Sequence, residues 1–320
     1  MITLLKNLVL SCISTTRLYI SYHSNNYRQS QLLAEIVRNV HSIEKGLCID
    51  NPRLGFGVKK IHVMFDLVDE YLAKEYDKTR PELQMVLSSI NDYIIFHKEK
   101  SFHSKEIDGI KNKISKLAEV LHADGSVKHG GCLSSEQIKI FGSVDDVLLK
   151  DALYNRHSIR KFSKSPIVES DLLAAINMAN RCPSACNRQT TRVYIIGKEK
   201  IDILNDWLDG IGGFVDSVNK FLIITGKTSA FNDGEIYQHI VNASIFTGYL
   251  SMCLTAFNIG NCIVQRPLLY SKKWRKFAKE NGIPGDENIV CMMAIGNYED
   301  NFKVPVSYRM PVEMIAKTLW

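Results

Sequence analysis

RHSIRKF, residues 156–162, is the stretch from which the organisation of this chain is most readily inferred. It places Arg156 and Arg160 on either side of Ser158. Arginine guanidiniums pair with phosphate oxygens through two parallel hydrogen bonds, and a serine hydroxyl can donate to the same anion. A solvated basic turn is the plainer interpretation of these residues. The stretch is therefore a candidate phosphate site that needs support from elsewhere in the chain.

Two further segments supply that support. CPSACNRQ, residues 182–189, combines small residues, which keep the backbone slim, with amide side chains that offer both donors and acceptors. Near the C-terminus, a serine and an arginine alternate on a segment that we expect to be extended. The candidate residues of these two segments are Pro183, Ser184, Ala185, Asn187, Gln189, Ser307 and Arg309.

The second half of the chain mixes strand and helix patterns. Runs of β-branched and apolar residues predict buried strands at 191–197, 221–226, 261–265 and 288–296. A capping sequence at 168–171 precedes a predicted amphipathic helix, and the apolar stretch 239–260 predicts a helix buried on nearly all sides. Because helices and strands alternate only loosely, we expect an α+β fold rather than a doubly wound parallel sheet.

The first half of the chain is predicted to be all-helical. Apolar residues recur at steps of three and four from residue 30 to residue 122, interrupted at NPRLGFG and again before Pro81. A stretch rich in glycine and polar residues, Asp124 to Cys132, follows as a predicted linker. We divide the chain into a helical extension, a linker and a second unit, with the boundaries 1–123, 124–140 and 141–320.

The apolar N-terminus raises the question of a membrane anchor. The uncharged run between Lys6 and Arg17 is ten residues long, whereas a bilayer-spanning helix needs about twenty. We expect an amphipathic helix docked on this protein or on a partner enzyme, with peripheral membrane attachment as the alternative.

Composition sets further limits. The formal net charge of +6 is spread along the chain and does not demand a nucleic-acid partner. The eight cysteines are irregularly spaced and form no CxxC pair, so we expect free, buried thiols in a reducing, cytoplasmic compartment and no metal site. His41 and Glu44, in the polar sequence HSIEKGL, lack the further ligands that a metal needs, and a salt-bridged helix end is the plainer interpretation.

From about Phe141 to its end, the chain resembles the nitroreductase family of FMN-dependent oxidoreductases. The resemblance is carried by RHSIRKF, by PSACNRQ, by FNIGNCIVQ and by the terminal Ser-x-Arg-x-Pro that ends at Pro311. These motifs stand in the family's order and cover a little over half of the chain. The helical extension resembles those of nitroreductase-like proteins associated with bacterial surface-polysaccharide synthesis.

The resemblance implies an α+β homodimer with a central antiparallel sheet flanked by helices and with two FMN sites, each lined by both chains. It places the RHSIRKF residues on the phosphate, ribityl and pyrimidine side of FMN and brings the PSACNRQ residues from the partner chain. Position 307 is commonly basic in the family, so a serine there shifts phosphate binding towards the arginines. The implied FMN residues are Arg156, His157, Ser158 and Arg160, then Pro183, Ser184, Ala185, Asn187 and Gln189, then the loop Cys262, Ile263, Val264 and Gln265, and finally Ser307 and Arg309.

These residues predict an FMN-dependent oxidoreductase. Hydride or electrons would pass by way of flavin N5 from NAD(P)H or a partner reductant to an unidentified small molecule, so we expect no catalytic side chain. Cys262 invites a nucleophilic role, but a cysteine at the end of an apolar strand more often serves packing. The chain has no G-x-G-x-x-G, so a nicotinamide would share the flavin pocket. The alternative is a non-catalytic flavin-binding or scaffold protein whose helical region is an interaction module.

Overall fold

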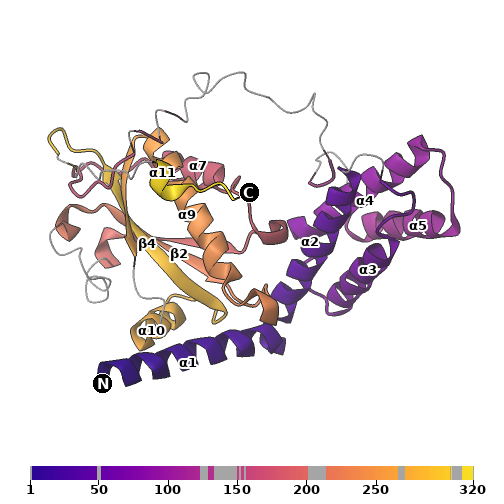
Figure 1. The fold of residues 1–320 in the computed structure, drawn as a ribbon, viewed down its shortest axis with the longest axis horizontal. Coiled ribbons are helices and arrows are strands. Elements are labelled where there is room, and N and C mark those ends of the chain that lie inside the picture. Colours follow the sequence, from indigo (N-terminus) through magenta and orange to yellow (C-terminus); the bar gives the residue numbers. More distant parts are fainter. Residues whose placement is uncertain are drawn as a thin grey trace.

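The chain forms a helical unit and a sheet unit, seen at opposite ends of the computed structural model in Figure 1. The structure describes residues 2–48, 52–122, 129–132, 150, 153–154, 156–200, 214–265, 271–302, 304 and 312–319. The expected α+β fold with a helical N-terminal region is confirmed. The expected division at residues 123 and 141 stays a prediction, because both boundaries lie outside the described residues.

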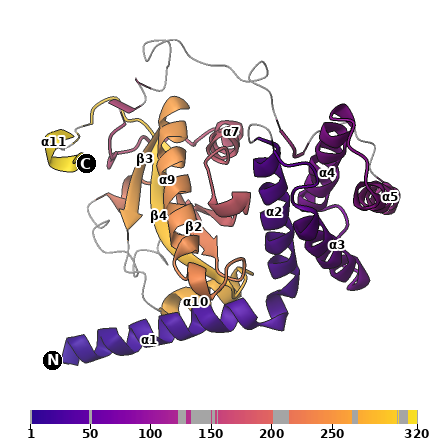
Figure 2. The same cartoon turned by 45° about the vertical axis from the view of Figure 1, so that its right-hand side comes forward.

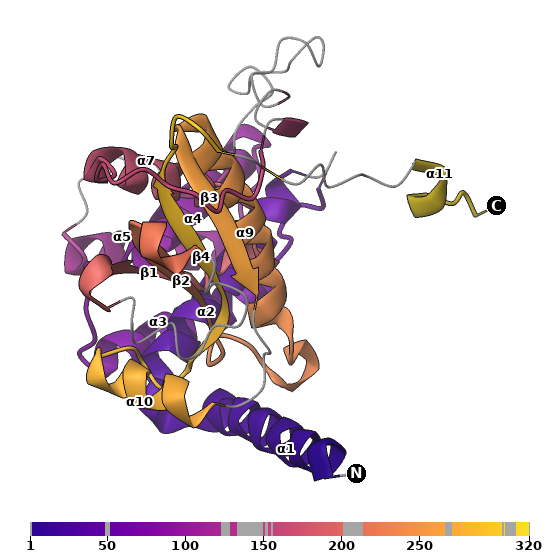
Figure 3. The same ribbon diagram turned by 90° about the vertical axis from the view of Figure 1, so that its left-hand side faces the viewer.

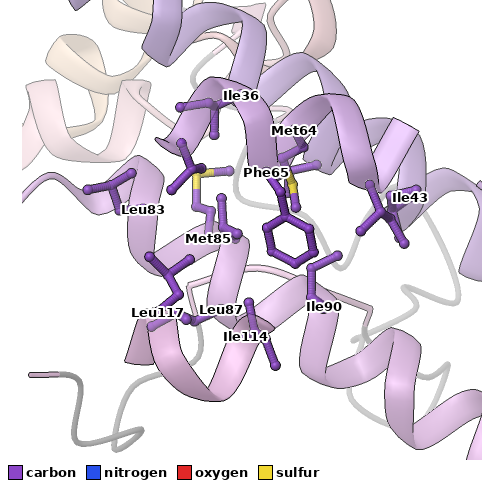
Figure 4. Packing of buried hydrophobic residues seen from close by; sticks show 14 of the residues in the cluster. Ile36, Ile43, Met64, Phe65, Leu83, Met85, Leu87, Ile90, Ile114 and Leu117 are labelled. Atoms are coloured by element: carbon purple, nitrogen blue, oxygen red, sulfur yellow. The ribbon is translucent and has the colours of Figure 1, made fainter. Parts of the chain in front are cut away.

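Four helices build the helical unit. Pro81 occupies the first position of α4, where its missing N–H costs nothing, and the Ser104 hydroxyl caps α5 by accepting from the Ile107 N–H at 3.2 Å. Their apolar faces meet in one core of aliphatic, methionine and aromatic side chains (Figure 4). The helices are α2 (Arg28–Leu47), α3 (Val58–Ala73), α4 (Pro81–Glu99) and α5 (Lys105–Val120).

The N-terminal helix α1 (Ile2–His23) touches the sheet unit near its C-terminal end. Leu18 and Tyr22 are buried in one cluster with Phe231, and the Ser21 and Thr228 hydroxyls share a hydrogen bond of 2.7 Å. The earlier part of α1 presents apolar side chains to solvent, Leu8 among them, and Figure 2 shows it running out beside α10. None of the described helices has the length and apolarity that crossing a membrane requires.

The sheet has four antiparallel strands in the order β1-β2-β4-β3. The last strand in sequence, β4, therefore lies between β2 and β3, as Figure 3 shows. All four strands coincide with the predicted ones to within two residues. They are β1 (Thr191–Gly197), β2 (Lys220–Lys227), β3 (Ile259–Gln265) and β4 (Glu287–Asn297).

Helices cover both faces of the sheet. Alternation of side chains along the strands gives each face its own cluster, because successive residues point to opposite sides. One cluster packs against α7 (Glu169–Ala179) and α9 (Gln238–Ala256), and the other packs against α10 (Lys272–Glu280). A short helix, α11 (Val312–Ile315), lies near the C-terminus.

The prediction that α9 is buried on nearly all sides is wrong in the single chain. Val241, Ile245 and Tyr249 are 46%, 37% and 46% exposed, and their spacing of four puts them on one face of the helix. The opposite face carries the buried residues, including Leu250 and Leu254. One apolar face of α9 is therefore left uncovered by the described residues of the single chain.

Candidate cofactor site

RHSIRKF runs beside the edge strand β3. Ser158 forms a parallel bridge with Asn261, and the Ile159 N–H donates to the Asn261 carbonyl at 2.9 Å. Phe162 forms a second, antiparallel bridge with Tyr298, just beyond β4. Ile159 and Phe162 are 2% exposed and anchor the segment in the core. With these two residues turned inward, the polar residues of the segment stay near the surface.

Asn261 fixes β3 against the C-terminal half of α9. Its side chain is buried, its Oδ1 accepts from the Ser251 hydroxyl at 2.6 Å, and its Nδ2 donates to the Ser251 carbonyl at 3.2 Å and to Thr255 Oγ1 at 3.3 Å. Sequence reasoning did not single out this residue. The signal was an asparagine at the start of a predicted buried strand, a position where a buried amide must find partners.

Three predicted residues of RHSIRKF converge on Cys262. Ser158 bridges Asn261, the residue before Cys262. Arg160, Ser158 and Arg156 each act to lower the pKa of the Cys262 thiol. The Arg160 side chain is exposed, whereas Arg156 is half-buried. Two guanidiniums and a hydroxyl thus gather at one place on the edge of the sheet, the arrangement that an anionic group needs.

The surroundings of Cys262 argue against a nucleophilic role. Burial raises the pKa of its thiol, and the nearby Arg160, the Ser158 hydrogen bond and Arg156 offset this only in part. The side chain is 4% exposed and belongs to the apolar cluster on the α10 side of the sheet. A protonated, buried thiol is a weak nucleophile at neutral pH, which supports the packing interpretation.

CPSACNRQ forms a tight loop. Cys186, Asn187 and Gln189 have φ of 52°, 55° and 48°, the left-handed region that asparagine tolerates better than most residues. The Ser184 hydroxyl closes the loop by accepting from the Gln189 N–H at 3.1 Å. The amide side chains of Asn187 and Gln189 also bond each other, with Gln189 Nε2 3.2 Å from Asn187 Oδ1.

Arg188, inside this loop, is the second residue that sequence reasoning missed. Its side chain is 1% exposed and donates to the carbonyls of Ala185 and Ala230 at 3.1 and 2.9 Å and to the Glu235 carboxylate. The hydrogen bonds from Arg188 hold the pKa of Glu235 below its usual value. The guanidinium also lies 4.4 Å from the ring centroid of Phe231. In the sequence, Arg188 stands between Asn187 and Gln189, and such a polar run is typical of an exposed loop. No local pattern therefore indicates that Arg188 is buried.

The two predicted segments contact opposite ends of α9. The Ala185 N–H donates to Asn242 at 3.1 Å near the start of the helix, whereas RHSIRKF lies beside Asn261, whose partner Ser251 is near its end. Asn242 and Ser251 are nine residues apart, which is roughly 14 Å at 1.5 Å per residue. Within one chain the described residues do not bring the two segments together.

The remaining predicted residues fall into three groups. Cys262 to Gln265 are residues of β3 rather than of a loop, with Val264 buried and Ile263 half-buried. His157 is half-buried beside the two arginines in sequence, and Pro183 is exposed at the start of the tight loop. Ser307, Arg309 and Pro311 lie outside the described residues.

A hollow of about 550 Å³ opens beside Phe162, where β1 ends and β2 begins. Lysines and acidic residues alternate around it, and it contains none of the predicted FMN residues. Its lining includes Lys161, Lys164, Lys198, Lys220, Glu199, Asp216 and Glu299. We therefore do not assign this hollow to the cofactor.

Comparison with known proteins gives one match to a family. Residues 153–212 match the model described as Nitroreductase family, and this range includes both RHSIRKF and CPSACNRQ. No curated protein matches the chain.

Solved structures that resemble the chain cover about half of it. An FMN-dependent nitroreductase from Clostridium difficile is 20% identical, with 53% of this chain and 98% of that chain covered and a TM-score of 0.45. A nitroreductase family protein from Streptococcus pneumoniae is 19% identical, with 53% and 99% covered and a TM-score of 0.44. A nitroreductase-like family protein from Bacillus cereus is 15% identical, with 57% and 98% covered and a TM-score of 0.45.

The family match falls on the two segments whose geometry is described above, and the architecture around them is the expected antiparallel sheet with flanking helices. Residues 153–212 are therefore similar to the nitroreductase family, and a helical extension precedes them.

Proposed function

We propose that this chain is an FMN-dependent oxidoreductase that passes electrons to a small-molecule acceptor. The observation that carries the proposal is the convergence of Arg156, Ser158 and Arg160 on the edge of β3, at Cys262. This cluster lies inside the range that matches the nitroreductase family. Backbone hydrogen bonds to Asn261 fix it to the sheet, so the cationic groups are held in position before any ligand arrives.

The residues present fit a flavin mononucleotide. Arg156 and Arg160 would hold its anionic side through charge-assisted hydrogen bonds, with the Ser158 hydroxyl as a further donor. Asn187 and Gln189 would offer amide donors and acceptors to the polar edge of the ring. The bound cofactor supplies the hydride chemistry, and the protein binds, orients and shields it. Arg309 remains a predicted phosphate ligand.

A second copy of this chain would complete the site. The exposed apolar face of α9, with Val241, Ile245 and Tyr249, is the kind of surface that homodimers bury. A partner docked over this face would present its own CPSACNRQ loop, which in one chain stands apart from RHSIRKF. The proposed dimer thus accounts both for the exposed face and for the separation of the two segments.

The proposed electron donor is a reduced nicotinamide or a partner reductant that enters the flavin pocket. The sequence offers no glycine-rich dinucleotide motif for a separate nicotinamide domain, so one pocket would serve donor and acceptor in turn. A cytoplasmic location is part of the same proposal.

Absorbance of the purified chain tests the flavin directly. We expect a yellow protein whose flavin band bleaches with NADH or NADPH in the absence of oxygen and returns when an acceptor is added. A protein that retains flavin but exchanges no electrons with any donor would favour the scaffold function. A colourless protein that ignores added FMN would refute the proposal.

The Arg156→Ala and Arg160→Ala variants locate the flavin. Each should weaken FMN binding by about tenfold, because each removes one charge-assisted contact. The matched control is Arg181→Ala, which removes an exposed guanidinium at the end of α7 and should bind FMN as the parent does. Equal losses in all three variants would point to general electrostatics rather than to this cluster.

Light scattering of the Ile245→Asp variant tests the dimer. A carboxylate at the centre of a buried apolar face is strongly unfavourable, so we expect the variant to be monomeric and to lose FMN together with dimerisation. Val63→Asp is the control, because Val63 is 50% exposed on α3, away from α9. A monomeric variant that still binds FMN normally would show that one chain makes the whole site.

A further inference from the structure

Two cysteines from distant parts of the sequence meet in the helical unit. Cys48 follows the last turn of α2 and its sulfur lies 3.3 Å from the sulfur of Cys132. Cys48 is exposed, and Cys132 is partly buried. The proposed flavin chemistry uses neither residue.

The segment 129–132 is held in place independently of its cysteine. The N–H groups of His129, Gly131 and Cys132 donate to Ser88, Glu44 and Asp92 at 3.1, 2.9 and 2.8 Å. These partners come from α2 and α4, so four consecutive residues of the predicted linker are in fact pinned to the helical unit.

A close approach explains one glycine of this segment. A Cβ at Gly130 would lie 2.5 Å from the Ser89 hydroxyl oxygen and 3.0 Å from the Met85 carbonyl oxygen. Only a residue without a side chain lets the backbone come this near to α4. Packing thus holds the backbone that leads to Cys132 close to α4.

Glu44 organises the same place. Its carboxylate accepts from the Ser89 hydroxyl at 2.8 Å and from the Gly131 N–H, and its side chain is only 13% exposed. His41 Nδ1 lies 3.2 Å from the other carboxylate oxygen. The polar sequence HSIEKGL therefore supplies the carboxylate that binds the 129–132 segment. The contact between His41 and Glu44 at this helix end agrees with the plainer interpretation of these residues.

We propose that Cys48 and Cys132 are a redox modification site that forms a reversible intramolecular disulfide by exchange with low-molecular-weight disulfides. The bond would close a loop that contains α3, α4 and α5. Oxidation then ties the end of α2 to residue 132, the last residue of the described segment 129–132.

The exchange balances in two steps. The exposed Cys48 thiolate attacks one sulfur of the small disulfide, forms a mixed disulfide and releases one thiolate, which takes up a proton. The Cys132 sulfur then gives up its proton, attacks the Cys48 sulfur and releases the second small thiolate, which is protonated in turn. Two protein thiols are oxidised, and one small disulfide is reduced to two thiols.

The order of the two thiols follows from their surroundings. Burial, together with the contact with Cys48, raises the pKa of the Cys132 thiol to about 12, and its Sγ–H donates to the Glu44 carbonyl at 3.5 Å. Cys132 is thus the poorer first nucleophile. Cys48 is accessible, so it reacts with the small disulfide first, and Cys132 resolves the mixed disulfide from within the fold.

Equilibration of the full chain in mixtures of oxidised and reduced glutathione tests the site. After acid quenching and alkylation, peptide mass spectrometry should find a disulfide between Cys48 and Cys132. We expect half-oxidation at a glutathione disulfide concentration at least about tenfold below that which half-modifies Cys48 in the Cys132→Ser variant, because the second thiol is already in place. The oxidised chain should also melt at least about 5 °C higher.

Three variants give the controls. Cys132→Ser should stop at one glutathione on Cys48, Cys48→Ser should remain unmodified at Cys132, and Cys12→Ser should behave as the parent, since Cys12 is an exposed thiol on α1. A parent chain that accumulates glutathione on Cys48 without the internal disulfide would overturn the proposal. So would a disulfide between any other pair. The parent measurement decides the question even if a variant fails to fold, and it requires neither flavin nor turnover.

Discussion

RHSIRKF and CPSACNRQ belong to the same family match, yet the fold holds them by different means. RHSIRKF is extended, lies on the edge of the sheet and is held by backbone bonds and two apolar anchors, which leaves its arginines available. CPSACNRQ is a loop with several residues at positive φ, and its one arginine, Arg188, is buried and paired with Glu235. The same residue type therefore serves the fold in CPSACNRQ and stays available for the proposed ligand in RHSIRKF, and burial is what separates the two arginine environments.

Replacement of Arg188 in the CPSACNRQ loop should have the largest effect on stability. Arg188→Met removes the guanidinium that donates to the Glu235 carboxylate and to the Ala230 carbonyl. We therefore expect the free energy of unfolding to fall by about 4 kcal/mol, as measured by chemical denaturation. Arg192→Met, an exposed arginine that bonds only backbone carbonyls, should change it by less than about 0.5 kcal/mol. Similar losses in both variants would contradict the structural role of Arg188.

Acidification should weaken the same end of α9. Burial lowers the pKa of His239, near the start of the helix, from 6.5 to about 4. His239 therefore binds a proton near pH 6.5 in the unfolded chain but only near pH 4 in the folded chain. This contribution to stability is complete above pH 6.5 and declines by up to ~3 kcal/mol as the pH falls towards 4.

Denaturation curves across this pH range measure the effect. The His239→Phe variant should show a flatter dependence of the free energy of unfolding on pH, because it has no imidazole to protonate. A parent and a variant with parallel pH profiles would show that His239 is accessible to protons in the folded chain.

Asn261 tests how β3 supports the RHSIRKF segment. Asn261→Ala removes the buried amide that joins β3 to α9, and it should lower the free energy of unfolding by about 2 kcal/mol and weaken FMN binding. The exposed Asn177 on α7 is the matched control, and Asn177→Ala should alter neither quantity. Loss of stability with intact FMN binding would mean that β3 does not position RHSIRKF.

The arginines of RHSIRKF should show the reverse profile to Arg188. Arg156→Ala and Arg160→Ala are expected to cost about tenfold in FMN affinity while the free energy of unfolding of the flavin-free protein stays within about 0.5 kcal/mol of the parent. Titration with FMN and denaturation of the same samples would reveal both quantities. A large stability loss in either variant would place that arginine with Arg188 rather than with the ligand.

Cys262 should give the smallest effect. Cys262→Ala removes a buried thiol from the core and should lower the free energy of unfolding by about 1 kcal/mol while electron transfer to an acceptor continues. Steady-state rates with reduced flavin provide the measurement. Complete loss of turnover in a folded, flavin-loaded variant would reinstate the nucleophilic role.

The strands and most helices were predictable because their signals are local. Alternating β-branched and apolar residues mark 191–197 and 288–296, and Pro81 marks the start of a helix, so these elements need no knowledge of their neighbours. The strand order and the pairing of Cys48 with Cys132 are not local in this sense. They depend on which distant segments pack together.

The sequence indicates the candidate residues of the site, but it does not indicate which other residues support them in the fold. RHSIRKF is recognisable from its charge pattern, but the support from Asn261 arises only when β3 and α9 have docked. Arg188 reads as a solvated residue until the fold buries it. The contribution of Ser307 and Arg309 stays a prediction, because these residues lie outside the part of the chain that the structure describes.

The central place of β4 has a consequence for synthesis of the chain. β3 pairs with β4 and not with β2, so it joins the sheet only after residue 297, the end of β4, has left the ribosome. The helical core contains only residues that precede 122 and can form earlier. Until then the sheet lacks its central strand, and a nascent chain that is interrupted before β4 would expose the apolar residues of β2 and β3 that pack beside β4. Molecular chaperones would meet this protein at that stage, with one unit folded and the other waiting for its last strand.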